Sequence, residues 1–257
     1  MRAVIVTQEE PFYLPLFLSK VLTEYEGIIA VILLPGTPHG FNFFSYIKRL
    51  YDVFGLRDFL AYGALFIRHK CLAFFSRWKQ FQRFYSVGAI ARMRSIPVYQ
   101  LKNINTPGSL ALLRTLKPEA IISVAAPQVF GKELINLARH TINVHAALLP
   151  QYRGMMPGFW VLAKGEGRTG VTVHHVDEHL DTGDIILQEA IDISPRDTLH
   201  SLQTKVANVG AATLLQALQR MEKGESGGIS IQGEGSYYPF PTREAAGEFR
   251  RRGRRVI

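Results

Sequence analysis

Apolar, β-branched runs alternate with helical patterns over the first 145 residues of the chain. The runs predict buried strands at 2–7, 28–34, 96–99, 119–125 and 141–145. Helices are predicted between them, at 14–25 and from Thr106–Pro107, an N-cap residue followed by proline, to about Lys117. Strands that alternate with helices predict an α/β fold, a Rossmann-like and mostly parallel sheet with flanking helices.

The pattern changes after the fifth predicted strand. Two strands, 170–177 and 184–193, are separated only by EHLDTG, and so short a link favours an antiparallel pairing. A long helix is predicted over 195–221, with apolar residues at helical spacing. No repeat or second domain is evident. We therefore expect one domain over 1–242, with an insert at 41–94, and an arginine-rich tail at 243–257.

Composition narrows the function classes. The chain has 257 residues, of which 47% are hydrophobic and 20% charged, as in a globular protein. A single cysteine, Cys71, excludes an intrachain disulfide and a cysteine-based zinc site. The first strand runs into QEEPFY, not a glycine-rich turn, which argues against an NAD(P) or FAD enzyme. The first residues do not resemble a signal peptide, so a cytoplasmic location is expected.

The insert at 41–94 is unusually aromatic and basic. It holds 15 of the chain's 28 aromatic residues and ten Lys/Arg against two Asp. The insert has a net charge of +8 and the tail +4, whereas the rest of the chain sums to −3. Amphipathic helices are expected, because Phe43, Ile47, Leu50 and Phe54 share a helical face. No apolar run reaches the roughly 18 residues that cross a bilayer.

Three interpretations of the insert remain open. It could be a helical subdomain that packs its aromatic residues on the sheet. It could lie on an anionic membrane as a peripheral contact, with Lys and Arg toward the headgroups. Contact with nucleic acid is the least favoured of the three, although basic and stacking aromatic residues would also suit RNA.

Two polar residues, Asn143 and His145, interrupt the fifth predicted strand. Being two apart, they face the same way at the strand's carboxyl end, where open α/β sheets place their ligand crevice. Each alone is ordinarily structural, the first a turn former and the second a satisfied histidine. The residues around them decide between the structural and the chemical interpretation.

The stretches NVHAALLPQYRG and TGVTVHHVDEHLDTGDI resemble the folate-dependent formyltransferase family, which includes glycinamide ribonucleotide, methionyl-tRNA and amino-sugar formyltransferases. The residues that match its pattern are Asn143, His145, Leu148, Leu149, Pro150, Arg153, Gly154, Thr169, Gly170, Thr172 and 180–183. The family usually has Pro-Ser after the histidine, where this chain has Ala146-Ala147. No catalytic group is lost by that change.

The resemblance implies transfer of a formyl group from 10-formyltetrahydrofolate to a primary amine, by a triad of Asn143, His145 and Asp181. Attack on the formyl carbon creates an oxyanion that Asn143 can stabilise. His145 can donate to the oxyanion or carry a proton from the amine to the departing folate nitrogen. Asp181 would hold the imidazole and favour its protonated form.

The resemblance also implies the binding residues. The folate would be held by two loops, largely through their backbone, at Gln128, Val129 and Phe130 and at Asp177, Glu178, His179 and Leu180. Arg153 would bind the acceptor. We expect no metal, because His174 and His175 point to opposite faces of a strand and cannot both bind one ion beside Asp177 and His179.

The acceptor is the least constrained part of the prediction. Arg153–Gly154 favours the methionyl-tRNA and amino-sugar branch, and the C-terminal domain of methionyl-tRNA formyltransferases has no counterpart here. The leading expectation is the amine of an amino sugar, nucleotide- or lipid-linked. The alternatives are a methionyl-tRNA formyltransferase-like enzyme lacking that domain and a non-catalytic RNA- or membrane-binding module. The oligomeric state, and a role of the arginine tail as substrate clamp, dimer contact or disordered arm, stay open.

Overall fold

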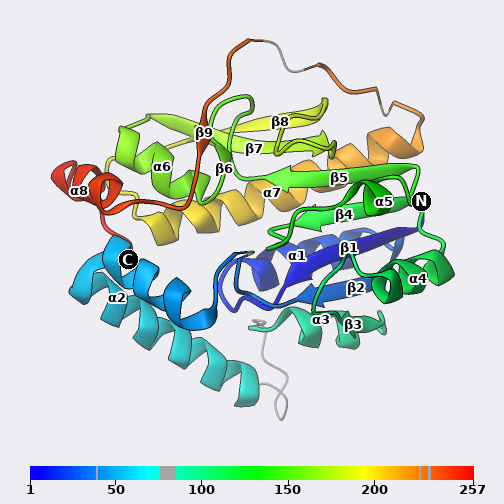
Figure 1. Cartoon of the computed structure of the whole chain (residues 1–257), viewed down its shortest axis with the longest axis horizontal. Helices are drawn as coiled ribbons and strands as arrows, with labels where there is room; N and C mark the ends of the chain where they lie inside the picture. The colour runs from blue at the N-terminus through cyan, green and yellow to red at the C-terminus, as the bar shows by residue number, and fades with distance from the viewer. Residues whose placement is uncertain (39, 76–84, 226, 231–232) are drawn as a thin grey trace.

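The structure, a computed structural model, describes residues 1–38, 40–75, 85–225, 227–230 and 233–257. Seven strands form one sheet in the order β3-β2-β1-β4-β5-β7-β8 (Figure 1). The first five pair in parallel, and β7 and β8 are antiparallel. The strands are β1 (Ala3–Gln8), β2 (Ile28–Leu34), β3 (Val98–Gln100), β4 (Ala120–Val124), β5 (His140–His145), β7 (Arg168–His175) and β8 (Ile185–Asp192). The predicted mostly parallel sheet is confirmed, as is the antiparallel pairing of the last two strands.

Helices cover both faces of the sheet. Along β1, Ala3 and Ile5 face one apolar layer while Val4 and Val6 face the other, as the two-residue period of a strand requires. The first layer contains α1 (Leu14–Glu24), α3 (Val87–Met93) and α7 (Leu199–Glu222), and the second contains α4 (Pro107–Leu116) and α5 (Lys132–Ile135). Both faces of the sheet are therefore buried, which leaves the ends of its strands as the places where a site can lie.

Local capping sets the helix boundaries. The Thr106 side chain accepts a hydrogen bond from the Ser109 backbone N–H and Pro107 opens α4, as predicted. Helix α7 begins at Leu199 and not at the predicted residue 195, because Thr198 forms a capping box with Ser201. The third strand begins two residues later and ends one residue later than predicted. Helix α6 (Pro157–Lys164) and a second sheet of β6 (Arg153–Gly154) and β9 (Tyr237–Tyr238) were not predicted.

The insert is helical in its described part. It forms α2 (Phe43–Phe75), which bends at Gly55, where φ is 75°, and then α3. Three of the insert's ten Lys and Arg residues, Arg77, Lys79 and Arg83, lie outside the described residues. No helix in the described part of the chain is both long enough and apolar enough to cross a membrane.

The arginine-rich tail folds back onto the domain. Helix α8 (Arg243–Arg251) buries Phe249, whose ring stacks on Phe159 of α6 at 4.8 Å between centroids. Arg250 donates to the Val53 carbonyl of α2, and Arg252 to the Ala163 carbonyl of α6. These arginines bind α8 to α2 and α6 of the same chain. This role differs from the substrate clamp, dimer contact and disordered arm considered for the tail.

Candidate active site

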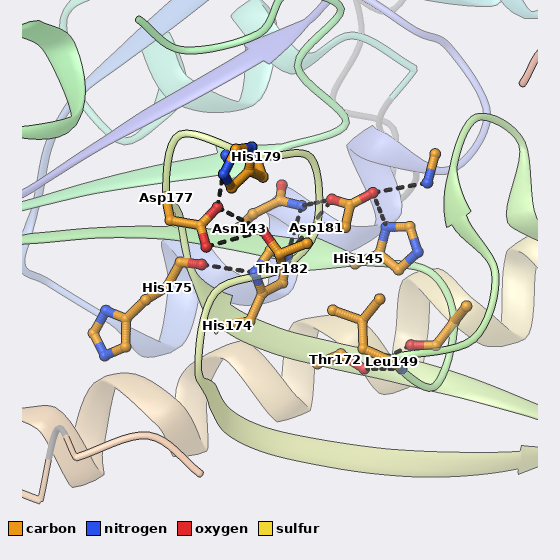
Figure 2. Close-up of polar contacts among 12 residues, drawn as sticks. Asn143, His145, Leu149, Thr172, His174, His175, Asp177, His179, Asp181 and Thr182 are labelled. Atoms are coloured by element: carbon orange, nitrogen blue, oxygen red, sulfur yellow. Dashed lines mark hydrogen bonds and ion pairs between the residues drawn. The ribbon is translucent and has the colours of Figure 1, made fainter. Parts of the chain in front are cut away.

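Polar side chains converge at the carboxyl end of β5. The parallel strands β1, β2 and β4 end on the same side of the sheet, which we call the catalytic edge (Figure 1). Asn143 and His145 stand on β5, and Asn143 lies opposite His174 of the antiparallel neighbour β7. The loop between β7 and β8 brings Asp181 to the same place (Figure 2). Three residues predicted from separate motifs therefore meet at the expected edge of the sheet.

Asp181 is the centre of this cluster. One of its carboxylate oxygens accepts a hydrogen bond from the Gly154 backbone N–H at 2.9 Å and lies 3.6 Å from His145 Nδ1. The other accepts from Asn143 Nδ2 at 3.4 Å and lies 3.7 Å from His174 Nε2. The side chain is only 7% exposed, and its backbone adopts a left-handed φ of 56°. Burying a carboxylate without hydrogen-bond or charged partners costs free energy. The partners of Asp181 offset that cost, so the stability of each member of the cluster depends on the others.

His145 has an acceptor at each ring nitrogen. Nε2 lies 2.9 Å from the carbonyl oxygen of Tyr152, which can only accept, so this nitrogen is the donor. Nδ1 faces the Asp181 carboxylate, which also accepts. Both ring nitrogens of His145 therefore face oxygen atoms that accept hydrogen bonds.

His174 is a member of the cluster that sequence reasoning missed. It is 2% exposed, its Nδ1 donates to the His175 carbonyl at 2.7 Å, and its Nε2 accepts from the Asn143 amide at 3.2 Å. Burial lowers the pKa of His174, although the carboxylate of Asp181 opposes that shift. His174 is thus a neutral acceptor that directs the NH₂ end of Asn143 toward Asp181.

A signal for His174 was present in the sequence. From the sequence alone, His174 is considered only as a metal ligand beside His175. Yet His174 alternates with Thr172 on a strand, and both side chains are almost fully buried on the face that neighbours Asn143 and His145.

Thr172 explains the T-G-x-T part of the motif. Its hydroxyl donates to the Ala147 carbonyl at 2.7 Å and accepts from the Leu149 N–H at 3.2 Å. Gln188 of β8 donates to the Leu149 carbonyl and to the same hydroxyl, each at 2.8 Å. The loop after His145 is therefore fixed through its backbone, and the fully buried Ala147 methyl takes the place where the family usually has a serine.

Two glycines of the motifs are required by close approach. Gly154 has a φ of 101°, and a Cβ on it would lie 2.2 Å from the Tyr238 carbonyl oxygen. At Gly183 a Cβ would lie 2.0 Å from the His175 carbonyl oxygen. Gly154 can thus pair with β9 and still point its N–H at Asp181.

The first predicted folate segment uses two of its side chains inside the protein. Gln128 accepts from the Ile104 N–H at 2.9 Å and donates to the Lys102 carbonyl at 2.8 Å. Phe130 is buried in the core, and only Val129 is well exposed. Any contact of this loop with a ligand would therefore rest mainly on its backbone and Val129.

The second predicted folate segment adjoins the first. Glu178 forms an ion pair with Lys132 at 2.7 Å, and Lys132 opens α5 just after the first segment. Asp177 holds its own loop, accepting from the Thr182 hydroxyl and from the His179 backbone N–H. Leu180 is exposed. The two loops thus come together beside the cluster, with Val129 and Leu180 as their exposed apolar side chains.

Arg153, predicted to bind the acceptor, stands next to Gly154 in β6. Its Nε is buried and has no hydrogen-bond partner among the described residues. A buried N–H without a partner costs free energy that an added acceptor would recover. For metals, no group of three or more His, Cys, Asp and Glu side chains within the described ranges is arranged to hold an ion.

Comparison with known proteins agrees with this fold. The formyl transferase family model matches residues 81–218, more than half of the chain. The chain belongs to the formyl transferase family.

Individual relatives give further detail. The chain is 43% identical over 137 residues to methionyl-tRNA formyltransferase of Anaeromyxobacter sp. (strain K), a match covering 53% of this chain and 44% of that protein. The chain thus spans less than half the length of such relatives. Phosphoribosylglycinamide formyltransferase from Anaplasma phagocytophilum has the same fold, with a TM-score of 0.62 at 16% identity over 94% of this chain and 99% of that one.

A third relative was solved with ligands. This formyltransferase, from Anoxybacillus kamchatkensis, is in complex with UDP-4,6-dideoxy-4-formamido-L-AltNAc and tetrahydrofolate. It has a TM-score of 0.50 at 24% identity, over 58% of this chain and 77% of that one. The likeness concerns the fold.

Proposed function

We propose that this protein transfers a formyl group from 10-formyltetrahydrofolate to the primary amine of an amino sugar. The observation that carries the proposal is the buried cluster in which Asp181 joins Asn143 and His145 at the carboxyl edge of the parallel strands. Membership of the formyl transferase family supports the reaction class.

The reaction must move protons as well as the formyl group. The amine arrives as an ammonium and loses one proton before it attacks the formyl carbon. A C–N bond then forms, the carbonyl electrons move onto oxygen, and the bond to the folate nitrogen breaks as that nitrogen takes up a proton. A second proton leaves the new amide. The protein must therefore stabilise an oxyanion and exchange protons at one place.

The cluster offers a group for each need. His145 Nε2 binds the Tyr152 carbonyl in this structure, and a substrate oxygen or nitrogen that replaced this carbonyl would meet an N–H held by Asp181 behind it. Asn143 lies next to it, and its amide NH₂ would stabilise an oxyanion by exchanging the long 3.4 Å hydrogen bond to Asp181 for one to the substrate oxygen. We assign proton transfer to His145, worth ~10²–10⁴ in rate, and oxyanion stabilisation to Asn143, worth ~10²–10³.

The folate co-substrate fits the two adjoining loops. Backbone groups at 128–130 and 177–180, with the exposed Val129 and Leu180, offer polar edges and apolar contact to a flat bicyclic ring. The Lys132–Glu178 ion pair fastens the two loops to each other. We propose that the pterin lies between these loops and directs the formyl group toward His145.

An amino sugar that is linked to a nucleotide or lipid through phosphate suits the acceptor side of the site. Arg153 follows the loop that supplies the Tyr152 carbonyl, and its buried Nε lacks a partner among the described residues. An acidic oxygen of a nucleotide- or lipid-linked sugar would satisfy it. Methionyl-tRNA is the second candidate, and the 43% identity to methionyl-tRNA formyltransferase favours it.

The test offers both acceptor classes to the same enzyme. The protein is incubated with 10-formyltetrahydrofolate and with nucleotide-linked amino sugars, lipid-linked amino sugars or methionyl-tRNA, and the formamide product is identified by mass spectrometry. Formylation of an amino sugar, abolished by His145→Ala, is the expected result. Formylation of methionyl-tRNA alone would overturn the sugar assignment, and no product with any amine would overturn the reaction itself.

A further inference from the structure

Helix α2 carries most of the exposed apolar surface that the structure describes. Nine of the fourteen large hydrophobic side chains that are exposed in the described residues lie on it. After the bend at Gly55, the exposed apolar side chains of α2 recur at helical spacing and form one stripe. We call this surface, made of Leu56, Leu60, Ile67, Cys71, Phe74 and Phe75, the α2 stripe; its five large members are each 58–64% exposed.

The opposite face of α2 is anchored to the domain. The Phe12 ring, which lies outside α2, is 5.1 Å from the Tyr62 ring and 4.9 Å from the His69 ring. The Asp58 carboxylate accepts from the Val256 N–H at 2.9 Å. Because one face is packed on the protein, the other is held outward in a fixed direction. The exposure of the stripe is a property of the folded state.

The charges around the α2 stripe are cationic. Arg57, Arg68 and Lys70 are exposed beside it, and Lys70 lies 5.5 Å from the centre of the Phe66 ring. The two acidic residues of α2 face elsewhere: Asp58 binds the Val256 N–H and Asp52 pairs with Arg243 of α8. An apolar stripe bordered by long cationic side chains is the pattern of a helix that lies in the interface of an anionic membrane.

Helix α2, which carries the stripe in its second half, begins on the side of the molecule where the parallel strands end (Figure 1). Helix α2 follows the carboxyl end of β2 and lies beyond the tips of the parallel strands (Figure 1). Tyr46 of α2 contacts the Phe240 ring at 5.9 Å, just after β9, and β9 pairs with the Gly154 segment that binds Asp181. The first half of α2 thus borders the carboxyl ends of the strands, and a surface that met the stripe would lie against the second half of the same helix.

We propose that the α2 stripe docks on a lipid surface with anionic headgroups and so presents the catalytic edge to an amino sugar carried by a membrane lipid. The choice of acceptor rests on the proposed function; the docking itself does not. A second copy packed stripe to stripe would bring the same cations together, which is unfavourable. RNA would use the cations but would leave Leu60 and Ile67 in water.

The single cysteine makes the docking directly measurable. Cys71 lies within the stripe and is exposed, so an environment-sensitive fluorophore attached to it reports burial in lipid. With phosphatidylcholine vesicles that contain phosphatidylglycerol, the emission should shift to the blue and the protein should co-sediment. High salt and the omission of phosphatidylglycerol should both weaken binding.

Matched variants separate the stripe from exposed apolar surface in general. Leu60→Glu with Ile67→Glu should weaken vesicle binding by about tenfold or more, because two apolar side chains can no longer leave water. Met93→Glu with Val129→Glu, at positions 65% and 62% exposed outside the stripe, makes the same number of apolar-to-acidic changes and should bind like the wild type. Equal binding by the stripe variant, or no binding by the wild type, would overturn the docking.

Further readouts keep the alternatives and the proposed function apart. A vesicle-free dimer that Leu60→Glu with Ile67→Glu dissolves would assign the stripe to a second copy. RNA binding that this variant retains, without vesicle binding by the wild type, would assign the cations to RNA. Vesicle binding by His145→Ala should equal that of the wild type, so inactivity toward every amine would refute only the reaction. Formylation of a soluble amino sugar without vesicle binding would refute only the docking.

Discussion

The cluster around Asp181 buries polar groups, whereas the α2 stripe exposes apolar ones. In the cluster, Asp181, His145 and His174 are each less than 8% exposed, and each has partners within 4 Å. In the stripe, large apolar side chains are about three-fifths exposed. Each region departs from the usual partition of residues between core and surface, in opposite directions.

The difference teaches how each region is maintained. Removing one member of the cluster leaves a buried polar group without its partner, so the cluster is sensitive to single substitutions. The stripe is held outward by the packed face of its helix, and its own side chains add little to folding. Changes in the cluster should therefore alter chemistry and stability, and changes in the stripe only what binds to it.

The largest effect is expected at His145. His145→Ala removes the proposed proton carrier and should lower kcat/KM for the amine by ~10²–10⁴, measured from tetrahydrofolate formation. The control is His140→Ala, at the other end of β5 and similarly buried at 8% exposed. Equal losses in the two variants would mean that any buried histidine of β5 matters and that the cluster has no special role.

A second large effect is expected at Gly154. Gly154→Ala places a methyl group against the Tyr238 carbonyl at a positive φ, and should lower the free energy of unfolding by about 1–3 kcal/mol and disturb the N–H that holds Asp181. Urea unfolding measures the first and kcat/KM the second. Gly167→Ala, where a Cβ meets nothing within 4 Å, is the control. An unchanged Gly154→Ala protein would show that the pairing of β6 with β9 is loose.

His174 should make stability depend on acid pH. Burial lowers its pKa below the value of 6.5, while Asp181 and Asp177 raise it and His145 lowers it further. The unfolded chain therefore binds a proton that the folded chain does not, so the free energy of unfolding is complete above about pH 6.5 and falls as pH drops below it, by up to about 1.4 kcal/mol per pH unit.

The variant His174→Gln isolates this contribution. It should be less stable than the wild type at neutral pH, and the difference should shrink between pH 6.5 and 5, as measured by urea unfolding at each pH. A constant difference across that range would show that His174 takes up its proton in the folded state as easily as in the unfolded chain.

The smallest effect is expected in the α2 stripe. Ile67→Ala should change the free energy of unfolding by no more than about 0.5 kcal/mol, because the side chain is 64% exposed. The same substitution at Ile121, fully buried in β4, should cost about 2–5 kcal/mol. A loss at Ile67 as large as that at Ile121 would mean that the stripe is covered in solution.

The sequence predicted the cluster better than it predicted α2, and the reason is physical. Asn143, His145 and Asp181 stand in motifs whose glycines are required by close approach, so the pattern of residue types specifies the geometry. The alternation of His174 with Thr172 marks it as a strand residue on one face, but only the pairing of β5 with β7, a contact between distant residues, places it beside Asn143.

For the insert, the sequence predicted the secondary structure but not the packing. Helix formation was predictable from its apolar spacing, and the described part is helical. The pattern did not decide which apolar residues face the protein, since aromatic residues surround the helix on most sides. The packing of the tail was likewise beyond a local pattern, because Arg250 and Arg252 find carbonyl partners far away in the sequence.

The most direct test of the central claim compares the wild type with Asp181→Asn in the rate of tetrahydrofolate formation from 10-formyltetrahydrofolate and an amino sugar. Asparagine keeps the shape and tolerates the left-handed backbone, so the fold should persist while the charge that His145 faces is lost. A rate lower by ~10² or more, in a protein whose circular dichroism shows that it remains folded, is the predicted result. Equal rates in the two proteins would contradict the assignment of the cluster as the active site.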